Sequence, residues 1–132
     1  MKREIKFRVW SCFQKHYLTD QGSVFLRDSG DVYNSNYIEQ SNLSTTVQMY
    51  TGRKDVNGKE IFEGDIVKFV GVTQSGREII QVVIWDNKGA RFMYDYSVDG
   101  SCGTPMMYIS APVEIIGNIF ENRTLLASLA DA

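Results

Sequence analysis

The chain has 132 residues, of which 43% are hydrophobic and 23% are charged. These fractions are those of soluble globular proteins, so they exclude a disordered chain and suit one domain with a buried core. The formal net charge of −2 excludes a bulk electrostatic attraction to nucleic-acid phosphates.

The N-terminal segment "MKREIKFRVW" is charged and lacks the apolar stretch of a secretory signal peptide. No run approaches the ~20 apolar residues of a membrane helix. The two cysteines, Cys12 and Cys102, lack the spacing of a zinc site and suit a reducing compartment, although a disulfide between them stays open. We therefore expect a cytoplasmic protein without a metal, a cofactor or a membrane segment.

Alternation of apolar and polar residues predicts strands along the first third of the chain. In "EIKFRVW", Ile5, Phe7 and Val9 alternate with charged residues, which indicates a half-buried strand with Arg8 on its wet face. "VFLRDSGDVY" predicts a hairpin with Ser29-Gly30 at its turn. The Asn-, Ser- and Thr-rich residues 34–46 predict a loop.

Four later stretches also predict strands: "DIVKFV", "EIIQVVIW", "RFMYDYSV" and "VEIIGNIF". The second is rich in β-branched residues and suits a strand covered on both faces. Residues 86–89 predict a turn, and residues 100–105 break the chain at two glycines and a proline. Gly117 is expected at a bulge or a close backbone approach. Asn122 is expected to cap a short C-terminal helix.

The central stretch "YTGRKDVNGKEIFEGDIVKF" predicts turns and not a ligand-binding loop. Its glycines lie six residues apart and lead into a strand, so the phosphate-loop pattern is absent. Asp55, Asn57 and Glu60 are too few oxygen ligands for a calcium loop. Asn57-Gly58 favours a tight hairpin turn with positive φ at both residues. Glu63-Gly64-Asp65 predicts a second reversal, in which Asp65 bonds its own backbone two residues on.

Four stretches together resemble the YopX family of small phage and prophage proteins: "REIKFRVW", "MYTGRKDVNGKEIFEGDIVKF", "VVIWDN" and "VEIIGNIFENRTLL". The resemblance implies a β-rich fold with an SH3-like barrel in the central and C-terminal part, carriage on a phage genome and no established activity. Four residues depart from the family pattern. Val9 and Ser11 stand where the opening strand of the family has Ala and Asp, Arg53 stands where it has Leu, and Arg123 where it has Pro. Any function that needs the first carboxylate is thereby in doubt.

These observations predict one mainly β domain over residues 1–132. We expect N-terminal strands and a loop over residues 1–49, a small SH3-like barrel over residues 50–120 and a short helix over residues 121–132.

Catalytic residues are hard to find in this chain. His16 is the sole histidine, and it shares a face with Cys12 only if both lie in a helix. The carboxylates of Glu60, Glu63 and Asp65 are close in sequence, but a solvated turn explains them better than a metal site. We therefore expect a protein that is not an enzyme.

A binding role fits the aromatic content of seven Tyr, seven Phe and two Trp. We expect a protein-binding or self-assembling phage accessory protein, with itself and a host or phage protein as partners. A small barrel that binds nucleic acid is the alternative, because exposed tyrosines can stack on bases. Trp85 is a further possible anchor, although core burial is the expected fate of both tryptophans. The candidate interaction surface consists of Trp10, Tyr94, Tyr96 and Tyr108.

Overall fold

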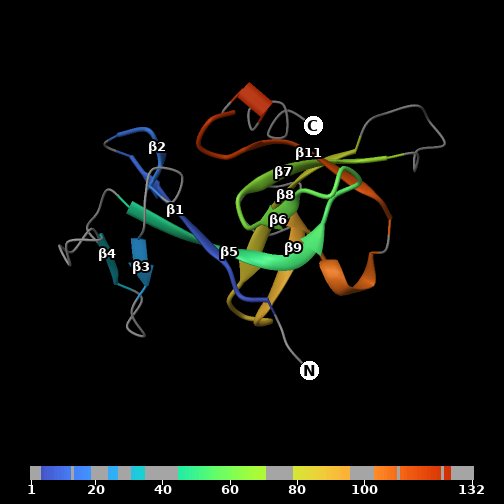
Figure 1. The fold of residues 1–132 in the computed structure, drawn as a ribbon. Coiled ribbons are helices and arrows are strands. Elements are labelled where there is room, and N and C mark those ends of the chain that lie inside the picture. The colour runs from blue at the N-terminus through green and yellow to red at the C-terminus, as the bar shows by residue number, and fades with distance from the viewer. Residues whose placement is uncertain are drawn as a thin grey trace. The chain divides into compact units, whose positions relative to one another are not determined.

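The computed structural model describes residues 4–12, 14–18, 24–26, 31–34, 45–70, 79–95, 103–109, 111–122 and 124–125. It is mainly β, as the sequence predicts. The strands are β1 (Phe7–Ser11), β2 (His16–Tyr17), β3 (Val24–Leu26), β4 (Val32–Asn34), β5 (Thr45–Lys54), β6 (Glu60–Phe62), β7 (Asp65–Phe69), β8 (Ile80–Asp86), β9 (Arg91–Asp95), β10 (Gly103–Pro105) and β11 (Val113–Asn118). The 3-10 helix η2 spans Met106–Tyr108 (Figure 1).

The chain divides into two compact units, residues 5–49 and residues 1–4 with 50–132. The division falls inside β5. The first half of β5 pairs with β1 in the smaller unit, and its second half pairs with β6 in the larger unit.

In the smaller unit, β1 pairs with β2 and β5, and β3 pairs with β4, all antiparallel. The hairpin predicted from "VFLRDSGDVY" is thus confirmed as β3 and β4, while its turn lies outside the described residues. β5 begins at Thr45, so the end of the predicted loop 34–46 is strand. Residues 35–44 lie outside the described residues.

Arg8 does not face water as the alternation in β1 predicts. It is half-buried, its Nε donates to Gln48 Oε1 at 2.8 Å, and its guanidinium carbon lies 4.6 Å from the centre of the Tyr17 ring. The Tyr17 hydroxyl donates to the same Gln48 oxygen at 3.0 Å. The arginine is held here by a hydrogen bond and by the negative face of the ring.

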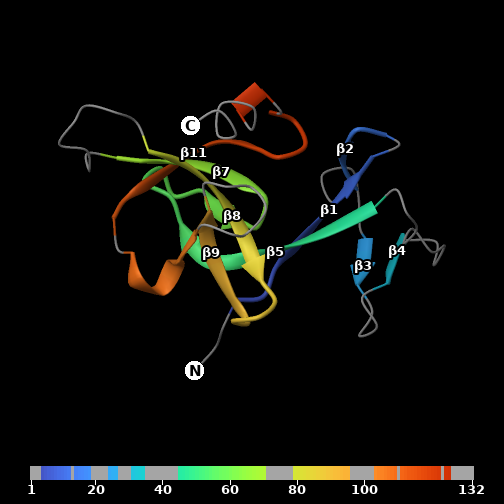
Figure 2. The same cartoon turned by 180° about the vertical axis from the view of Figure 1, so that it is seen from behind.

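The larger unit holds a five-stranded antiparallel sheet in the order β10-β9-β8-β7-β11. The sheet curls like half a barrel, which is visible from both sides (Figure 1, Figure 2). Neighbouring residues of β7 and β8 enter two different hydrophobic clusters. Val67 and Val83 belong to the first cluster, and Ile66 and Val82 belong to the second. The prediction that β8 is covered on both faces is therefore confirmed for its centre.

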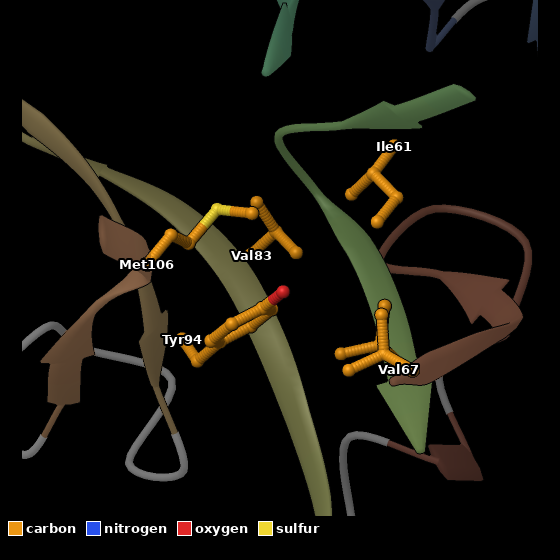
Figure 3. Packing of buried hydrophobic residues seen from close by; sticks show 6 residues of the cluster. Ile61, Val67, Val83, Tyr94 and Met106 are labelled. Atoms are coloured by element: carbon orange, nitrogen blue, oxygen red, sulfur yellow. The ribbon is translucent and has the colours of Figure 1, made fainter. Parts of the chain in front are cut away.

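The first cluster lies inside the curl of the sheet. Figure 3 shows the Tyr94 ring among the side chains of Val67, Val83 and Met106, with Ile61 of β6 close by. The Tyr94 ring also meets the Phe69 ring edge-on, with the ring centres 5.1 Å apart. Aromatic rings that pack in this way contribute a large buried area to a small core.

Residues 103–105 do not break the chain as predicted. They form β10, which pairs with β9 at the edge of the sheet. A Cβ atom at Gly103 would lie 2.8 Å from the Tyr94 carbonyl oxygen, so glycine permits this close pairing. Pro105 ends the strand, and an edge strand tolerates the missing N–H of a proline.

The hairpin between β5 and β6 turns through three residues, 56–58. Gly58 has φ +80°, but Asn57 is not among the described residues with positive φ. The Gly58 N–H donates to the Asp55 carbonyl at 3.0 Å, and the Asp55 N–H to the Lys59 carbonyl at 2.8 Å. This is the three-residue hairpin loop that ends in one left-handed residue. The predicted hairpin turn is confirmed, while the expectation of positive φ at Asn57 is wrong.

β11 carries a bulge between Ile115 and Gly117. A Cβ atom at Gly117 would lie 2.5 Å from Asn122 Cγ and Oδ1. The bulge expected at Gly117 is thus confirmed, while the close neighbour there is the Asn122 side chain and not another backbone segment. Asn122 Oδ1 accepts from the Asn118 N–H at 3.0 Å, so this described bond runs back along the chain and does not cap a helix. Residues 124–125 have helical backbone, and the rest of the predicted helix lies outside the described residues.

Candidate functional site

The Asp55 carboxylate is the centre of a hydrogen-bond network in the larger unit. The side chain is 7% exposed. Its Oδ1 accepts from the backbone N–H groups of Asn57 at 2.9 Å and Lys59 at 2.8 Å. Its Oδ2 accepts from the Ile115 N–H at 3.0 Å, 60 residues further along the chain. Asp55 therefore shapes the hairpin loop and attaches it to β11.

Two opposing effects set the pKa of Asp55. Burial alone raises the pKa of this carboxyl, but the N–H groups of Ile115, Lys59 and Asn57 and the charge of Lys59 favour the ionised form, and the net pKa lies below its usual value. A second attachment lies beside it, because the Val56 N–H donates to the Val113 carbonyl at 2.9 Å. The "DVNG" motif is thus a structural clamp.

Arg53, near the end of β5, is held through both its side chain and its backbone. Its Nη1 donates to the Ile109 carbonyl at 2.8 Å, and its backbone N–H donates to Thr51 Oγ1 at 3.2 Å. Burial raises the pKa of Tyr94, and the charge of the neighbouring Arg53 opposes that rise without cancelling it. The guanidinium is therefore positioned before any ligand arrives, although Arg53 itself is exposed.

Arg53 lines two hollows. The first, of about 330 Å³, adjoins the clamp and is lined by Lys54, Asp55, Val56, Tyr94 and Val113 among others. The second, also about 330 Å³, is more apolar. Both volumes lie at the low end of the range for ligand sites. We name the second hollow the aromatic–methionine groove and define it by Arg53, Trp85, Arg91, Phe92, Met106 and Met107.

The aromatic–methionine groove combines exposed and buried apolar groups. Trp85 is 43% exposed and Met107 is 65% exposed, while Met106 is buried in the first cluster. Trp85 and Phe92 are cross-strand partners of β8 and β9, and their rings meet edge-on with centres 5.0 Å apart. Arg91 stands beside them, with its Nε 3.4 Å from Asp86 Oδ2.

Two of the four residues of the interaction surface predicted from the sequence are buried. Trp10 is 5% exposed and Tyr94 is 2% exposed, so both are covered by their own neighbours. Trp10 packs edge-on against Tyr17, with ring centres 5.0 Å apart. Tyr96 and the side chain of Tyr108 lie outside the described residues.

Trp85 was expected in the core and is instead the exposed tryptophan. The alternation of β8 places it on the face of Val83, but it is the last residue before Asp86, where the core ends. Its position directly before a polar turn is the signal that could have indicated exposure.

The carboxylates of the central stretch do not gather. Asp65 is buried, and its Oδ2 accepts from the Phe62 N–H at 2.8 Å. The expected solvated turn is therefore wrong for Asp65, and its described bond runs three residues back along the chain. Within the described residues, no three His, Cys, Asp or Glu side chains lie close enough to hold a metal ion. His16 is half-buried opposite Ser11 in the register of β1 and β2, and Cys12 is exposed beside it.

A search of the described part of the chain for a long apolar helix that could span a membrane finds none.

The fold and the groove define a class: a small, mainly β protein with a curled antiparallel sheet and an exposed aromatic groove. The sequence matches the YopX protein family over residues 6–127, so the chain belongs to the YopX family. The resemblance drawn from its motifs is thereby confirmed.

The fold is also similar to the crystal structure of protein EF1440 from Enterococcus faecalis, with a TM-score of 0.62 and 24% sequence identity. The match covers 95% of this chain and 99% of that one, so the likeness concerns the fold over nearly the whole length. No curated protein matches the sequence.

Proposed function

We propose that this protein is a non-catalytic protein-binding module that presents the aromatic–methionine groove to its partner. The observation that carries the proposal is the pair of exposed apolar side chains, Trp85 and Met107, in one hollow with Phe92 and two arginines. Trp, Phe, Met and Arg are the residues that protein interfaces enrich, and Trp and Arg dominate their binding energy. Methionine adds adaptability, because its flexible side chain fits partners of different shape.

The setting of this activity is the bacterial cytoplasm, where the protein acts as a phage or prophage accessory protein. Membership of the YopX family supports this setting. The partners are a second copy of the chain, in a homo-oligomer, and a host or phage protein. At the level of the fold, we propose that the curled sheet belongs to an SH3-like barrel and that a short helix follows β11.

The proposal includes that the protein is not an enzyme. This part is supported by the buried carboxylates of the central motif, which accept hydrogen bonds from backbone N–H groups. Asp55 accepts three N–H groups, and Asp65 accepts the Phe62 N–H. A carboxylate committed to backbone donors stabilises the fold and is poorly placed to exchange protons with a substrate.

Binding of single-stranded nucleic acid is the second candidate function. The observation that favours it is the exposed Trp85 beside Arg53 and Arg91, because nucleic-acid grooves combine a stacking ring with cations. The net charge of −2 and the burial of Tyr94, one of the expected stacking residues, weigh against it.

The test is light scattering behind size exclusion, with absorbance at 260 and 280 nm recorded and a pull-down from host lysate. Trp85→Ala and Met107→Ala are compared with Val70→Ala, which truncates an exposed side chain that does not line the groove. We expect a nucleic-acid-free oligomer, or a captured protein, that the two groove variants lose and Val70→Ala keeps. Association that all three variants keep would contradict the proposal, and a monomer carrying nucleic acid would favour the second candidate.

A further inference from the structure

We infer that the aromatic–methionine groove takes an acidic peptide segment of a partner protein, with an apolar side chain against Trp85 and a carboxylate on Arg53. The inference rests on the proposed function and adds the chemistry of the partner. It is carried by the complementarity between the charges around the groove and those of the ligand.

The charged residues that line the groove are both cations. Arg53 and Arg91 are part of its lining, and no described carboxylate is. Asp86 approaches from outside through its ion pair with Arg91. A ligand that presented a cation here would meet like charges next to an apolar surface, which costs binding energy.

Arg53 is prepared to receive a carboxylate. A guanidinium has five N–H donors in a fixed plane, and the described side-chain bond uses Nη1 toward the Ile109 carbonyl at 2.8 Å. This bond restricts the side chain, so a ligand has less of a long side chain to order when it binds. The remaining edge can donate to the paired oxygens of a carboxylate.

Arg91 adds a second positive charge to the lining. Its Nε is buried and lies 3.4 Å from Asp86 Oδ2, so this nitrogen faces Asp86 and is not open to a ligand. The charge of the arginine still favours an acidic ligand over a basic one.

The apolar part of the groove matches one side chain and not an extended ring stack. Trp85 already meets Phe92 edge-on, and the hollow of about 330 Å³ has room for a single Phe, Tyr or Leu side chain with its backbone. Met107, at 65% exposure, can close over that side chain. Single-stranded nucleic acid instead needs a basic track along several phosphates, which a chain of net charge −2 does not favour.

The experiment is selection from a yeast-displayed library of random short peptides with the full-length protein, followed by counter-selection with Trp85→Ala. We expect the retained peptides to carry Asp or Glu next to Phe, Tyr or Leu. A peptide of the consensus sequence is then compared with its Asn/Gln analogue by fluorescence polarisation. The acidic peptide should bind at least about tenfold more tightly, because a hydrogen bond to a charged group is worth about that factor.

The variant Arg53→Gln tests whether the carboxylate of the bound peptide lies at Arg53. It should weaken the acidic peptide by about tenfold and leave its neutral analogue unchanged, since only the acidic peptide has a charge to lose. Lys88→Gln removes the same charge from an exposed residue of the neighbouring turn that does not line the groove, and it should change neither affinity by more than about twofold.

The outcomes separate this inference from the proposed function. A neutral or basic consensus that still requires Trp85 overturns the acidic partner and keeps the groove as a protein-binding site. A library without any Trp85-dependent peptide overturns the inference, while an oligomer that Trp85→Ala dissolves would identify a second copy as the occupant. Tighter binding of an oligothymidine than of every peptide overturns both.

Discussion

Replacement of Asp55 by Asn is expected to destabilise the larger unit by about 2–4 kcal/mol, because the carboxylate accepts three backbone N–H groups from a buried position. An asparagine of the same shape can keep its oxygen toward Asn57 and Lys59, as weaker neutral bonds. Its amide nitrogen then faces the Ile115 N–H, so two donors oppose each other. Asp55→Ala leaves all three N–H groups without that acceptor and should cost more, on the order of 3–5 kcal/mol.

The pH dependence of stability follows from the lowered pKa of Asp55. The unfolded carboxyl has a pKa of about 4, and the folded one lies below it. The contribution of Asp55 is therefore fully present above that unfolded value and is lost as the pH falls through the folded pKa. In Asp55→Asn, the free energy of unfolding should therefore depend less on pH in this acidic range.

Urea unfolding monitored by near-UV circular dichroism across pH 3–7 measures both effects, and amide hydrogen exchange at Ile115 reports on the clamp itself. Asp86→Asn is the control, since it removes an equally negative but more exposed side chain and should cost less than about 1 kcal/mol. An Asp55→Asn protein with wild-type stability, an unchanged acid limb and unchanged exchange at Ile115 would refute the reasoning.

Three further changes test other features. Gly58→Val should cost about 1–3 kcal/mol, because φ is +80° in open space and the penalty is conformational; an unchanged urea midpoint would contradict this. Gly117→Ala should lower the free energy of unfolding by about 1–3 kcal/mol, because its Cβ would displace the Asn122 side chain and break the bond to the Asn118 N–H. Adding Asn122→Ala should recover part of that loss. A double variant that loses the sum of the two single losses would argue against the clash. Tyr94 has a raised pKa, so its contribution to stability is present below about pH 10 and lost as the pH rises through the folded value. In urea unfolding, Tyr94→Phe should lose less stability than the wild type does as the pH rises above about 10. An equal loss of stability in the two proteins would exclude Tyr94 as its source.

The sequence predicts the elements of this fold well where periodicity is strong. The run that becomes β8 and the hairpin at Gly58 carry clear local signals, β-branched content in one case and a turn glycine in the other. β10 was missed because its glycine and proline read as breakers. Only its place at a sheet edge, against the Tyr94 carbonyl, makes them suitable. Such a long-range pairing leaves no pattern in the local sequence.

The binding groove was harder to predict than the fold. Aromatic content indicated a surface rich in rings, but it could not say which rings the core would take. Trp10 and Tyr94 are buried, because their strands place them against other elements. Trp85 is exposed because its strand extends beyond the core. The role of Arg53 depends on the Ile109 carbonyl, 56 residues away in the chain, which no local motif encodes.

The clamp between the hairpin and β11 has a consequence for the order in which the chain acquires its structure. The Ile115 N–H that completes the Asp55 network follows that residue by 60 positions, and ribosomes add roughly 5–20 residues per second. The hairpin therefore waits about 3–12 s during synthesis for its last partner, since 60 residues are added at that rate. β11 also supplies the edge of the sheet beside β7. The hydrogen-bond network of the larger unit is thus complete only after translation has passed β11, and premature termination before that strand would release a chain with an open sheet edge.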